Sequence, residues 1–140
     1  MHKSIFLIEA AFVAGLISCG EGASDRDIWE SKNISSYQIK QSISCFCINE
    51  GPYRVVVKDD TLYSAVNSYT NEPVDAKSLN LYTIDELFDL IDQAQSYHAE
   101  VLKVEFDGIF HYPKKIDIDY SRQAVDDELS IVISDFGVDP

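Results

Sequence analysis

Apolar and polar residues alternate along most of this chain with the period of a β-strand. The alternation is clear in residues 36–47, 102–106, 116–120 and 129–133, each of which predicts a half-buried strand. Two further strands are predicted over residues 53–58 and 61–69. Asn49-Glu50-Gly51-Pro52 and Asp59-Asp60 are turn signals between the first three of these strands in chain order, and Asp107-Gly108 opens a loop after the fourth. We therefore expect strands joined by short connections.

One segment between the third and fourth strands has the period of a helix instead. Apolar residues recur at spacings of three and four at Ile84, Leu87, Phe88, Ile91 and Ala94. Thr83, followed three residues later by Glu86, is a capping box that satisfies backbone N–H groups at a helix start. These signals predict a helix from Thr83 to Tyr97.

A shorter helix is predicted from Ile28 to Ile34, with Asp27 as its N-cap and Trp29 as its anchor in the core. The predicted order is then a short helix, three strands, one helix and three strands. Short connections favour antiparallel neighbours. The expected fold class is α+β, with an antiparallel sheet of about six strands packed on one long helix and a short N-terminal helix.

The first nineteen residues differ in character from the rest of the chain. Lys3 supplies a positive charge, an apolar run follows that only Glu9 interrupts, and the segment ends in Leu16-Ile17-Ser18-Cys19. This order resembles a bacterial lipoprotein signal peptide that ends in a lipobox. The resemblance implies cleavage before Cys19 and acylation of its thiol. The alternative is a buried helix of a cytosolic protein with an ordinary cysteine.

The lipoprotein interpretation divides the chain into a signal peptide (residues 1–18), a lipidated Cys19 with a tether (19–28) and one domain (29–140). It places the protein in the cell envelope, attached to a membrane through its lipid. Two or more acyl chains hold a protein stably. Gly20, rather than an aspartate, follows Cys19, which favours the periplasmic face of the outer membrane if the host is Gram-negative.

Charge narrows the range of partners. The chain has 24 acidic and 11 basic residues and a net charge of −13. Such a domain is repelled by phosphate backbones and by anionic lipid headgroups, so we expect no nucleic-acid partner. The acidity suits a basic partner or divalent cations, and it is also typical of an ordinary soluble surface that repels itself.

Cys45 and Cys47 are the first candidate site. Two residues apart in a strand, they point to the same face, with Cα atoms about 6.5–7 Å apart, at the edge of disulfide range. A bridge would need a local bend or bulge, and export favours its oxidation. A structural disulfide, two free buried thiols, and a redox or soft-metal role all remain open. His98 and His111 lack the spacing of zinc ligands.

Carboxylates and an aromatic segment supply two further candidates. Asp117 and Asp119 share a strand face, and Asp126-Asp127-Glu128 follows nearby, an oxygen-rich group that could suit calcium, although no calcium-loop motif occurs. Residues 110–113 (Phe110-His111-Tyr112-Pro113) shape a hairpin loop or form an exposed aromatic loop that contacts a ligand.

Several motifs spread along the chain together resemble the DUF6174 family, small bacterial secreted or lipid-anchored domains of unknown function. The matching residues are Trp29, Tyr37, Cys45-Phe46-Cys47, Thr83-Ile84-Asp85-Glu86-Leu87-Phe88, Tyr112-Pro113, Ile116-Asp117-Ile118-Asp119 and Asp126-Asp127-Glu128. The resemblance covers nearly the whole chain after the signal. His111 departs from the family pattern, which often has glycine before the Tyr-Pro pair. The family supplies no known activity or site.

Two functional hypotheses follow from these observations. The first is a non-enzymatic, lipid-anchored envelope domain that binds or scaffolds an envelope protein partner. The second is a thiol redox or metal-handling protein that uses Cys45 and Cys47. A hydrolase is disfavoured because the chain has no Gly-rich phosphate loop, His-Glu-x-x-His or Gly-x-Ser-x-Gly motif. No cofactor or metal site is expected.

Overall fold

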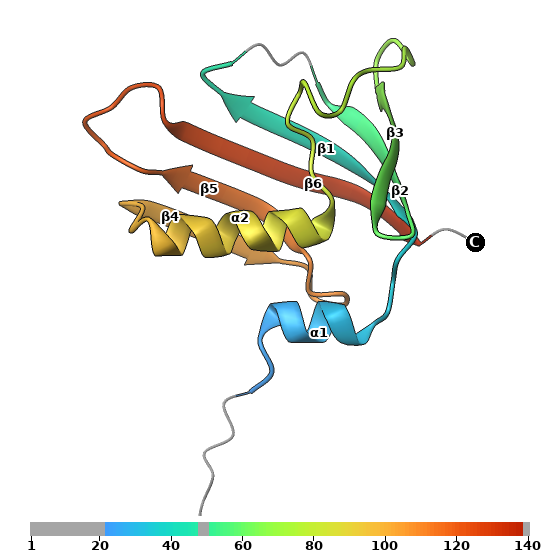
Figure 1. Cartoon of the computed structure of the whole chain (residues 1–140), viewed down its shortest axis with the longest axis horizontal. Coiled ribbons are helices and arrows are strands. Elements are labelled where there is room, and N and C mark those ends of the chain that lie inside the picture. Colours follow the sequence, from blue (N-terminus) through green and yellow to red (C-terminus); the bar gives the residue numbers. More distant parts are fainter. Residues whose placement is uncertain (1–21, 48–50, 139–140) are drawn as a thin grey trace, which may run out of the picture.

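The computed structural model describes residues 22–47 and 51–138 of the 140-residue chain. The described part contains two helices and six strands (Figure 1). In chain order they are α1 (Asp25–Ser31), β1 (Tyr37–Cys45), β2 (Tyr53–Lys58), β3 (Thr61–Asn67), α2 (Ile84–Ser96), β4 (Val101–Phe106), β5 (Pro113–Asp119) and β6 (Glu128–Val138). The predicted signal peptide, Cys19 and part of the turn at 49–52 lie outside the described residues. Within them, no helix is long and apolar enough to cross a bilayer.

The strands form one antiparallel sheet in the order β3-β2-β1-β6-β5-β4. Two three-stranded meanders, one before α2 and one after it, therefore meet through β1 and β6 at the centre of the sheet. The α+β class and the antiparallel sheet of six strands are confirmed. The prediction of one long helix is wrong, because α2 has only 13 residues and α1 has 7.

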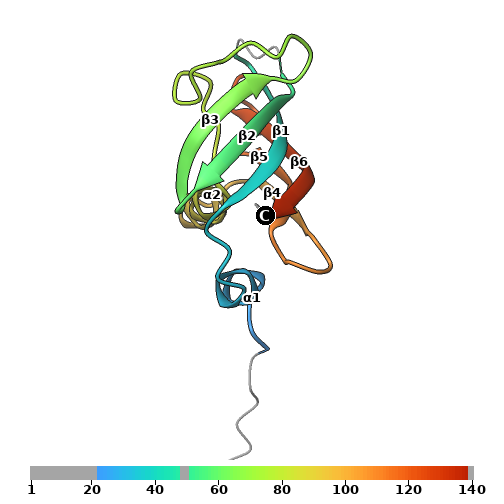
Figure 2. The same ribbon diagram turned by 90° about the vertical axis from the view of Figure 1, so that its right-hand side faces the viewer.

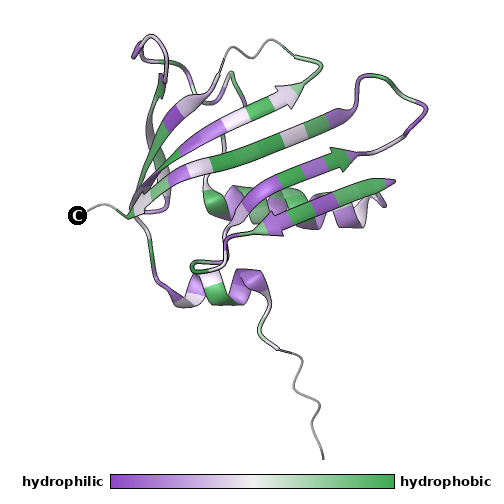
Figure 3. Ribbon diagram, turned by 180° about the vertical axis from the view of Figure 1, so that it is seen from behind, coloured by the Kyte–Doolittle hydropathy of each residue, from purple (hydrophilic) through white to green (hydrophobic). Residues whose placement is uncertain are grey.

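Helix α2 lies against one face of the sheet, and α1 lies beyond the sheet at one end (Figures 1 and 2). The core forms between α2 and the facing side chains of the strands. Its members include the expected apolar residues of both layers: Ile39, Val55, Val57, Ile84, Leu87, Phe88, Ile91, Ile116, Ile118, Ile131 and Ile133. Along β1 and β5 these positions alternate mainly with hydrophilic ones (Figure 3), whereas the apolar Val56 and Val132 lie between buried residues of β2 and β6. The alternation that predicted the strands therefore also defines the buried face.

Strand β1 carries a buried polar residue among its apolar ones. Gln41 is fully buried on the same face as Tyr37 and Ile39. Its side-chain amide donates to the carbonyl oxygen of Tyr82 and accepts from the N–H of Tyr82, each at 3.0 Å. The hydroxyl of Tyr37 accepts from the N–H of Ile84 at 2.8 Å. Two side chains of β1 therefore hold the backbone where α2 begins.

These contacts also determine the properties of Tyr37. Burial raises the pKa of its phenol well above the ordinary value of 10.0, although the hydrogen bond from Ile84 acts in the opposite direction.

The capping box predicted at α2 is confirmed, with Thr83 Oγ1 accepting from the N–H of Glu86 at 3.2 Å and Glu86 Oε2 accepting from the N–H of Thr83 at 2.7 Å.

Strand β6 extends beyond its predicted end at Ile133 because a bulge changes which side chains face inward. The register between β1 and β6 shifts between Gln38 and Lys40, and Asp135 there has a φ of 51°. After this extra residue, Phe136 faces the core side of the sheet. Its ring lies 5.8 Å from that of Tyr37 and 4.8 Å from that of Tyr112.

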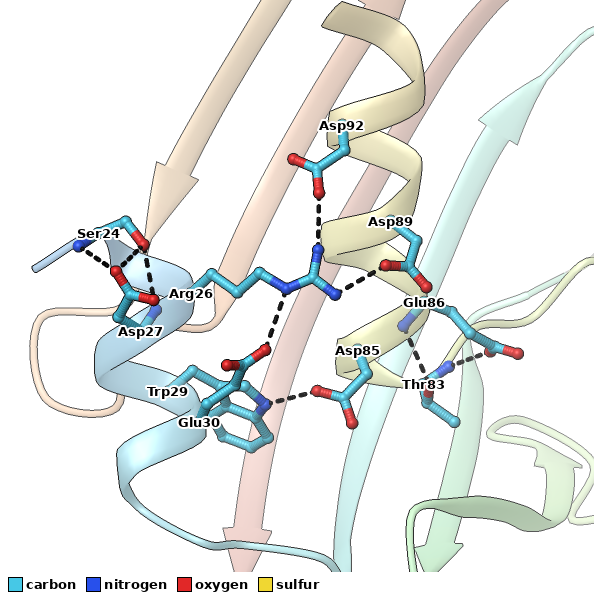
Figure 4. Close-up of polar contacts among 10 residues, drawn as sticks. All are labelled: Ser24, Arg26, Asp27, Trp29, Glu30, Thr83, Asp85, Glu86, Asp89 and Asp92. Atoms are coloured by element: carbon cyan, nitrogen blue, oxygen red, sulfur yellow. Dashed lines mark hydrogen bonds and ion pairs between the residues drawn. The ribbon is translucent and has the colours of Figure 1, made fainter. Parts of the chain in front are cut away.

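Helix α1 begins earlier than predicted. Ser24 is the N-cap and Asp27 occupies the third helical position of a capping box, so the assignment of Asp27 as N-cap is wrong (Figure 4). Residues 25–28, assigned to the tether, belong to this helix. Trp29 is the predicted anchor, only 3% exposed, and its indole N–H donates to Asp85 at 3.0 Å.

Arg26 forms a second link between α1 and α2. Its guanidinium contacts Asp89 and Asp92 of α2 at 2.7 Å each and Glu30 of its own helix at 3.1 Å (Figure 4). The hydrogen bond with Asp89 is the main cause that raises the pKa of Arg26. The three carboxylates are more than half exposed. Water and salt weaken such pairs, so the buried Trp29 contributes more to the docking of α1.

We predict that Gln41→Ala destabilises the domain, because it removes a fully buried side chain and leaves the part-buried N–H and C=O of Tyr82 without their partners. The expected loss in the free energy of unfolding is roughly 1–3 kcal/mol. Gln38→Ala is the matched control, since Gln38 lies on the exposed face of the same strand. Urea denaturation of both variants checks the prediction, and equal effects of the two substitutions would contradict it.

Candidate functional site

A pocket of about 410 Å³ lies at the end of β1 that is farther from α1. Its polar lining comes from neighbouring strands: Ser44 of β1, Asp117 and Asp119 of β5, and Glu128 and Ser130 of β6. Phe46 and Val125 are among its apolar lining residues. We call it the distal pocket. Asp117 and Asp119 alternate along β5 with the buried Ile116 and Ile118, so the pocket lies on the sheet face that α2 does not cover.

Strand pairing brings these residues together. Ser130 lies between Ser44 and Asp117 in register, and its hydroxyl donates to Asp117 Oδ1 at 2.6 Å. Asp119 lies opposite Glu128. Residues directly opposite each other on antiparallel strands are in side-chain range, so two carboxylates face each other here.

A disulfide joins Cys45 to Cys47 beside the pocket. Their Cα atoms are 5.1 Å apart, closer than two residues of a regular strand, because β1 ends at Cys45 and the chain bends at Phe46. A disulfide between cysteines only two residues apart was expected to need a local bend, and the bend at Phe46 supplies it. The expectation that both cysteines lie on the apolar face is wrong for Cys47, which is exposed.

The bridge brackets a single apolar residue. Phe46, between the two cysteines, is 80% exposed, and Val125 in the loop between β5 and β6 is 83% exposed. Among the described residues, these are the two most exposed large apolar side chains, and both line the distal pocket. Two apolar side chains therefore project into solvent beside one concave, acidic surface.

The carboxylates of the pocket differ in their partners. Asp117 accepts the hydrogen bond from Ser130 and lies 3.6 Å from the ammonium of Lys115. Oδ1 of Asp119 is shielded from solvent, yet no described residue donates a hydrogen bond to it. An acceptor that is buried without a donor is unfavourable. Among the described residues, no lysine, arginine or histidine lines the pocket, and three carboxylates do, so the charge of this described lining is negative.

The structure does not assemble a metal centre from these groups. Among residues 22–47 and 51–138, no three His, Cys, Asp or Glu side chains are placed to hold a metal ion. Asp126 is exposed and does not line the pocket. Asp127 Oδ1 is shielded without a hydrogen-bond donor among the described residues, as Asp119 Oδ1 is. The predicted carboxylate group therefore divides between the pocket and its flanking loop.

The predicted aromatic loop at residues 110–113 turns mostly inward. Tyr112 is 7% exposed, Pro113 is fully buried, and the ring of Phe110 lies 4.9 Å from that of Phe136. The expectation of exposed aromatic rings is therefore wrong for Tyr112, and burial raises the pKa of its phenol. At the tip of the loop, Ile109 is the exposed apolar residue, at 71%.

His111 has a structural role in this loop. Its Nδ1 lies 2.8 Å from Asp25 Oδ1, which ties the loop to α1. Its φ of 62° lies in the left-handed region, where glycine is the most tolerant residue. This backbone conformation explains how glycine could occupy the same position in a related chain.

Sequence reasoning selected Cys45, Cys47, Asp117, Asp119 and Glu128, and the structure places Cys45 and the three carboxylates around one pocket. It did not select Ser44, Phe46, Val125 or Ser130 as site residues. The position of Phe46 between two cysteines was the signal that could have marked it. Ser130 and Val125 carry no local signal, because strand pairing and the path of a loop bring them to the site.

Comparison with known proteins gives one match. Residues 21–138 match the family model described as "Family of unknown function (DUF6174)". No curated protein and no solved structure matches the chain. The matched region includes both helices and all six strands of the described structure. The chain therefore belongs to the DUF6174 family.

Proposed function

We propose that this protein is a lipid-anchored cell-envelope protein whose domain binds a partner at the distal pocket without catalysing a reaction. The observation that carries the proposal is the pairing of Phe46 and Val125 with an acidic pocket between them. Large apolar side chains that project into solvent around a concave surface are typical of binding sites. The disulfide supports this role because it restrains the backbone on both sides of Phe46.

The arrangement of the domain suits attachment through Cys19. That residue precedes the start of α1 at Asp25 by only six positions, and α1 lies at the end of β1 opposite the distal pocket. A lipid on Cys19 would therefore leave the pocket directed away from the membrane. The net charge of −13 also disfavours contact between the domain and anionic headgroups.

We predict that the chain expressed in a bacterial host incorporates labelled palmitate and sediments with membranes, and that Cys19→Ser abolishes the labelling. The physical reason is that the thiol of Cys19 is the acceptor of the diacylglyceryl group. Cys47→Ser is the matched control, because it removes a different cysteine and should keep the label. Labelling that persists in the Cys19→Ser variant would refute the anchor.

The second candidate function is a thiol redox role. It is favoured by one observation, that Cys45 of the disulfide lines the distal pocket. A redox protein would cycle this pair between thiols and disulfide, whereas a binding protein would keep it oxidised. The two functions therefore differ in what reduction of the pair does.

We predict that the purified protein contains no free thiol at Cys45 or Cys47 before reduction, by alkylation and mass spectrometry, and that it does not accelerate reduction of insulin by dithiothreitol. The double variant Cys45→Ser, Cys47→Ser should remain folded and lose about 1–2 kcal/mol of stability, because the bridge closes a very short loop. Insulin reduction that depends on both cysteines would contradict the proposed binding role and support the redox one.

A further inference from the structure

We propose that the distal pocket recognises a segment of another protein in which a lysine or arginine lies beside an apolar side chain. The inference rests on the proposed binding function and specifies its ligand. Two independent properties of the pocket lead to it: the carboxylates of its lining and the exposed apolar residues at its rim.

The acidic surface requires a cationic donor. Of the lining residues that the structure describes, Asp117, Asp119 and Glu128 carry carboxylates and none is basic. Asp117 already has an ion-pair partner in Lys115 and a hydrogen-bond donor in Ser130. Oδ1 of Asp119 is shielded from solvent, but the Asp119 side chain as a whole is only half-buried and Glu128 is exposed. An ammonium or guanidinium group in the pocket would pair with these two carboxylates and offset the repulsion between Asp119 and Glu128 across the strand pair.

The exposed apolar side chains at the rim favour a ligand that carries an apolar group next to its cation. Phe46 and Val125 are 80% and 83% exposed, and a lone amine would leave both in water. An apolar side chain next to the basic one would cover them, and the ring of Phe46 can also attract a nearby cation through its face. The disulfide holds Phe46 between fixed neighbours, which reduces the conformational entropy lost on binding.

A protein segment fits these requirements better than the other cationic ligands of an envelope. A small polyamine matches the carboxylates but has no apolar side chain for the rim. A membrane surface with anionic headgroups is repelled by the carboxylates of the pocket. A peptide with adjacent basic and apolar residues satisfies both parts of the site, and a pocket of about 410 Å³ accommodates such side chains rather than a whole folded domain.

The test uses the full-length lipidated protein, purified in a neutral detergent, and three short probes with blocked ends. The first probe is acetyl-Gly-Leu-Lys-Leu-Gly-amide. The second replaces lysine by glutamate, and the third replaces both leucines by glycine. Spermidine is a fourth probe. Binding is followed by isothermal titration, with thermal unfolding of each variant as the check on folding.

We expect the leucine–lysine peptide to bind at least about tenfold more tightly than each other probe, since one charge-assisted hydrogen bond or one buried apolar contact is enough for this ratio. Asp119→Asn and Phe46→Ala should each weaken its binding by a similar factor. Asp126→Asn is the matched control, because Asp126 is an exposed aspartate outside the pocket lining, and it should change the affinity by less than about twofold.

Each other result overturns the inference. Equal binding of the glutamate peptide removes the charge preference, and equal binding of spermidine or the glycine probe removes the apolar requirement. Absence of binding by any probe at millimolar concentration, or binding that Asp119→Asn and Phe46→Ala leave unchanged, excludes this site. If Asp119→Asn does not fold, Glu128→Gln takes its place. Acceleration of insulin reduction that depends on both cysteines would instead overturn the proposed function, and that assay compares the unaltered protein with the double cysteine variant alone.

Discussion

The hydrogen bonds between β1 and the start of α2 connect the two halves of this fold. The amide of Gln41 pairs with both backbone groups of Tyr82, 41 residues later, and the hydroxyl of Tyr37 accepts from Ile84, 47 residues later. The first N–H groups of a helix have no partner within the helix, and burial makes that deficit costly. Because β1 meets both β2 and β6, the residues that satisfy α2 also lie at the centre of the sheet. Strand β1 therefore fixes where α2 begins, while the rest of the helix packs on β4 and β5 and contacts α1.

Elements with local signals could be predicted from the sequence, and those determined by distant partners could not. The alternation of β2 and the capping box at Thr83 and Glu86 are complete within a few residues. Gln41 interrupts an apolar face, and its burial is favourable only because Tyr82 lies opposite it in the fold. The extension of β6 depends on the bulge at Asp135, which alternation alone does not reveal.

The start of α1 illustrates a different limit. Ser24 and Asp27 are both residue types that cap helices, and they lie three positions apart. In the structure Ser24 is the N-cap and Asp27 is the third helical residue of the same capping box. Both residues therefore mark a single helix start, and their residue types alone do not show which of them is the N-cap. Trp29 was recognisable as an anchor because it is a large aromatic residue in a polar segment, but its partner Asp85 lies in the other helix. The residue types thus predicted the helix and its buried Trp29, whereas the residue at which the helix begins became clear only from its contacts in the fold.

The candidate site is formed mainly by strand pairing. Cys45, Asp117 and Asp119 could be selected individually, because cysteine pairs and repeated carboxylates are visible in a sequence. Their combination into one surface requires β6 to lie between β1 and β5, which brings Ser130 between Ser44 and Asp117. The aromatic loop turns inward for a related reason: the aromatic rings of Phe136 and Trp29 near it contact Tyr112 in the core.

The same sheet separates the proposed site from the proposed anchor. Strand β1 runs from the α1 end of the domain to the distal pocket, and its nine residues span about 30 Å at the usual rise of a strand. The polar and aromatic contacts of α1, through Arg26 and Trp29, fix the helix that follows the anchor against α2. Any force transmitted from a lipid on Cys19 would therefore reach the core through α1, and the sheet would hold Phe46 and its acidic pocket away from the membrane. The sheet between the α1 end and the distal pocket would then allow the domain to present this one binding surface to a partner.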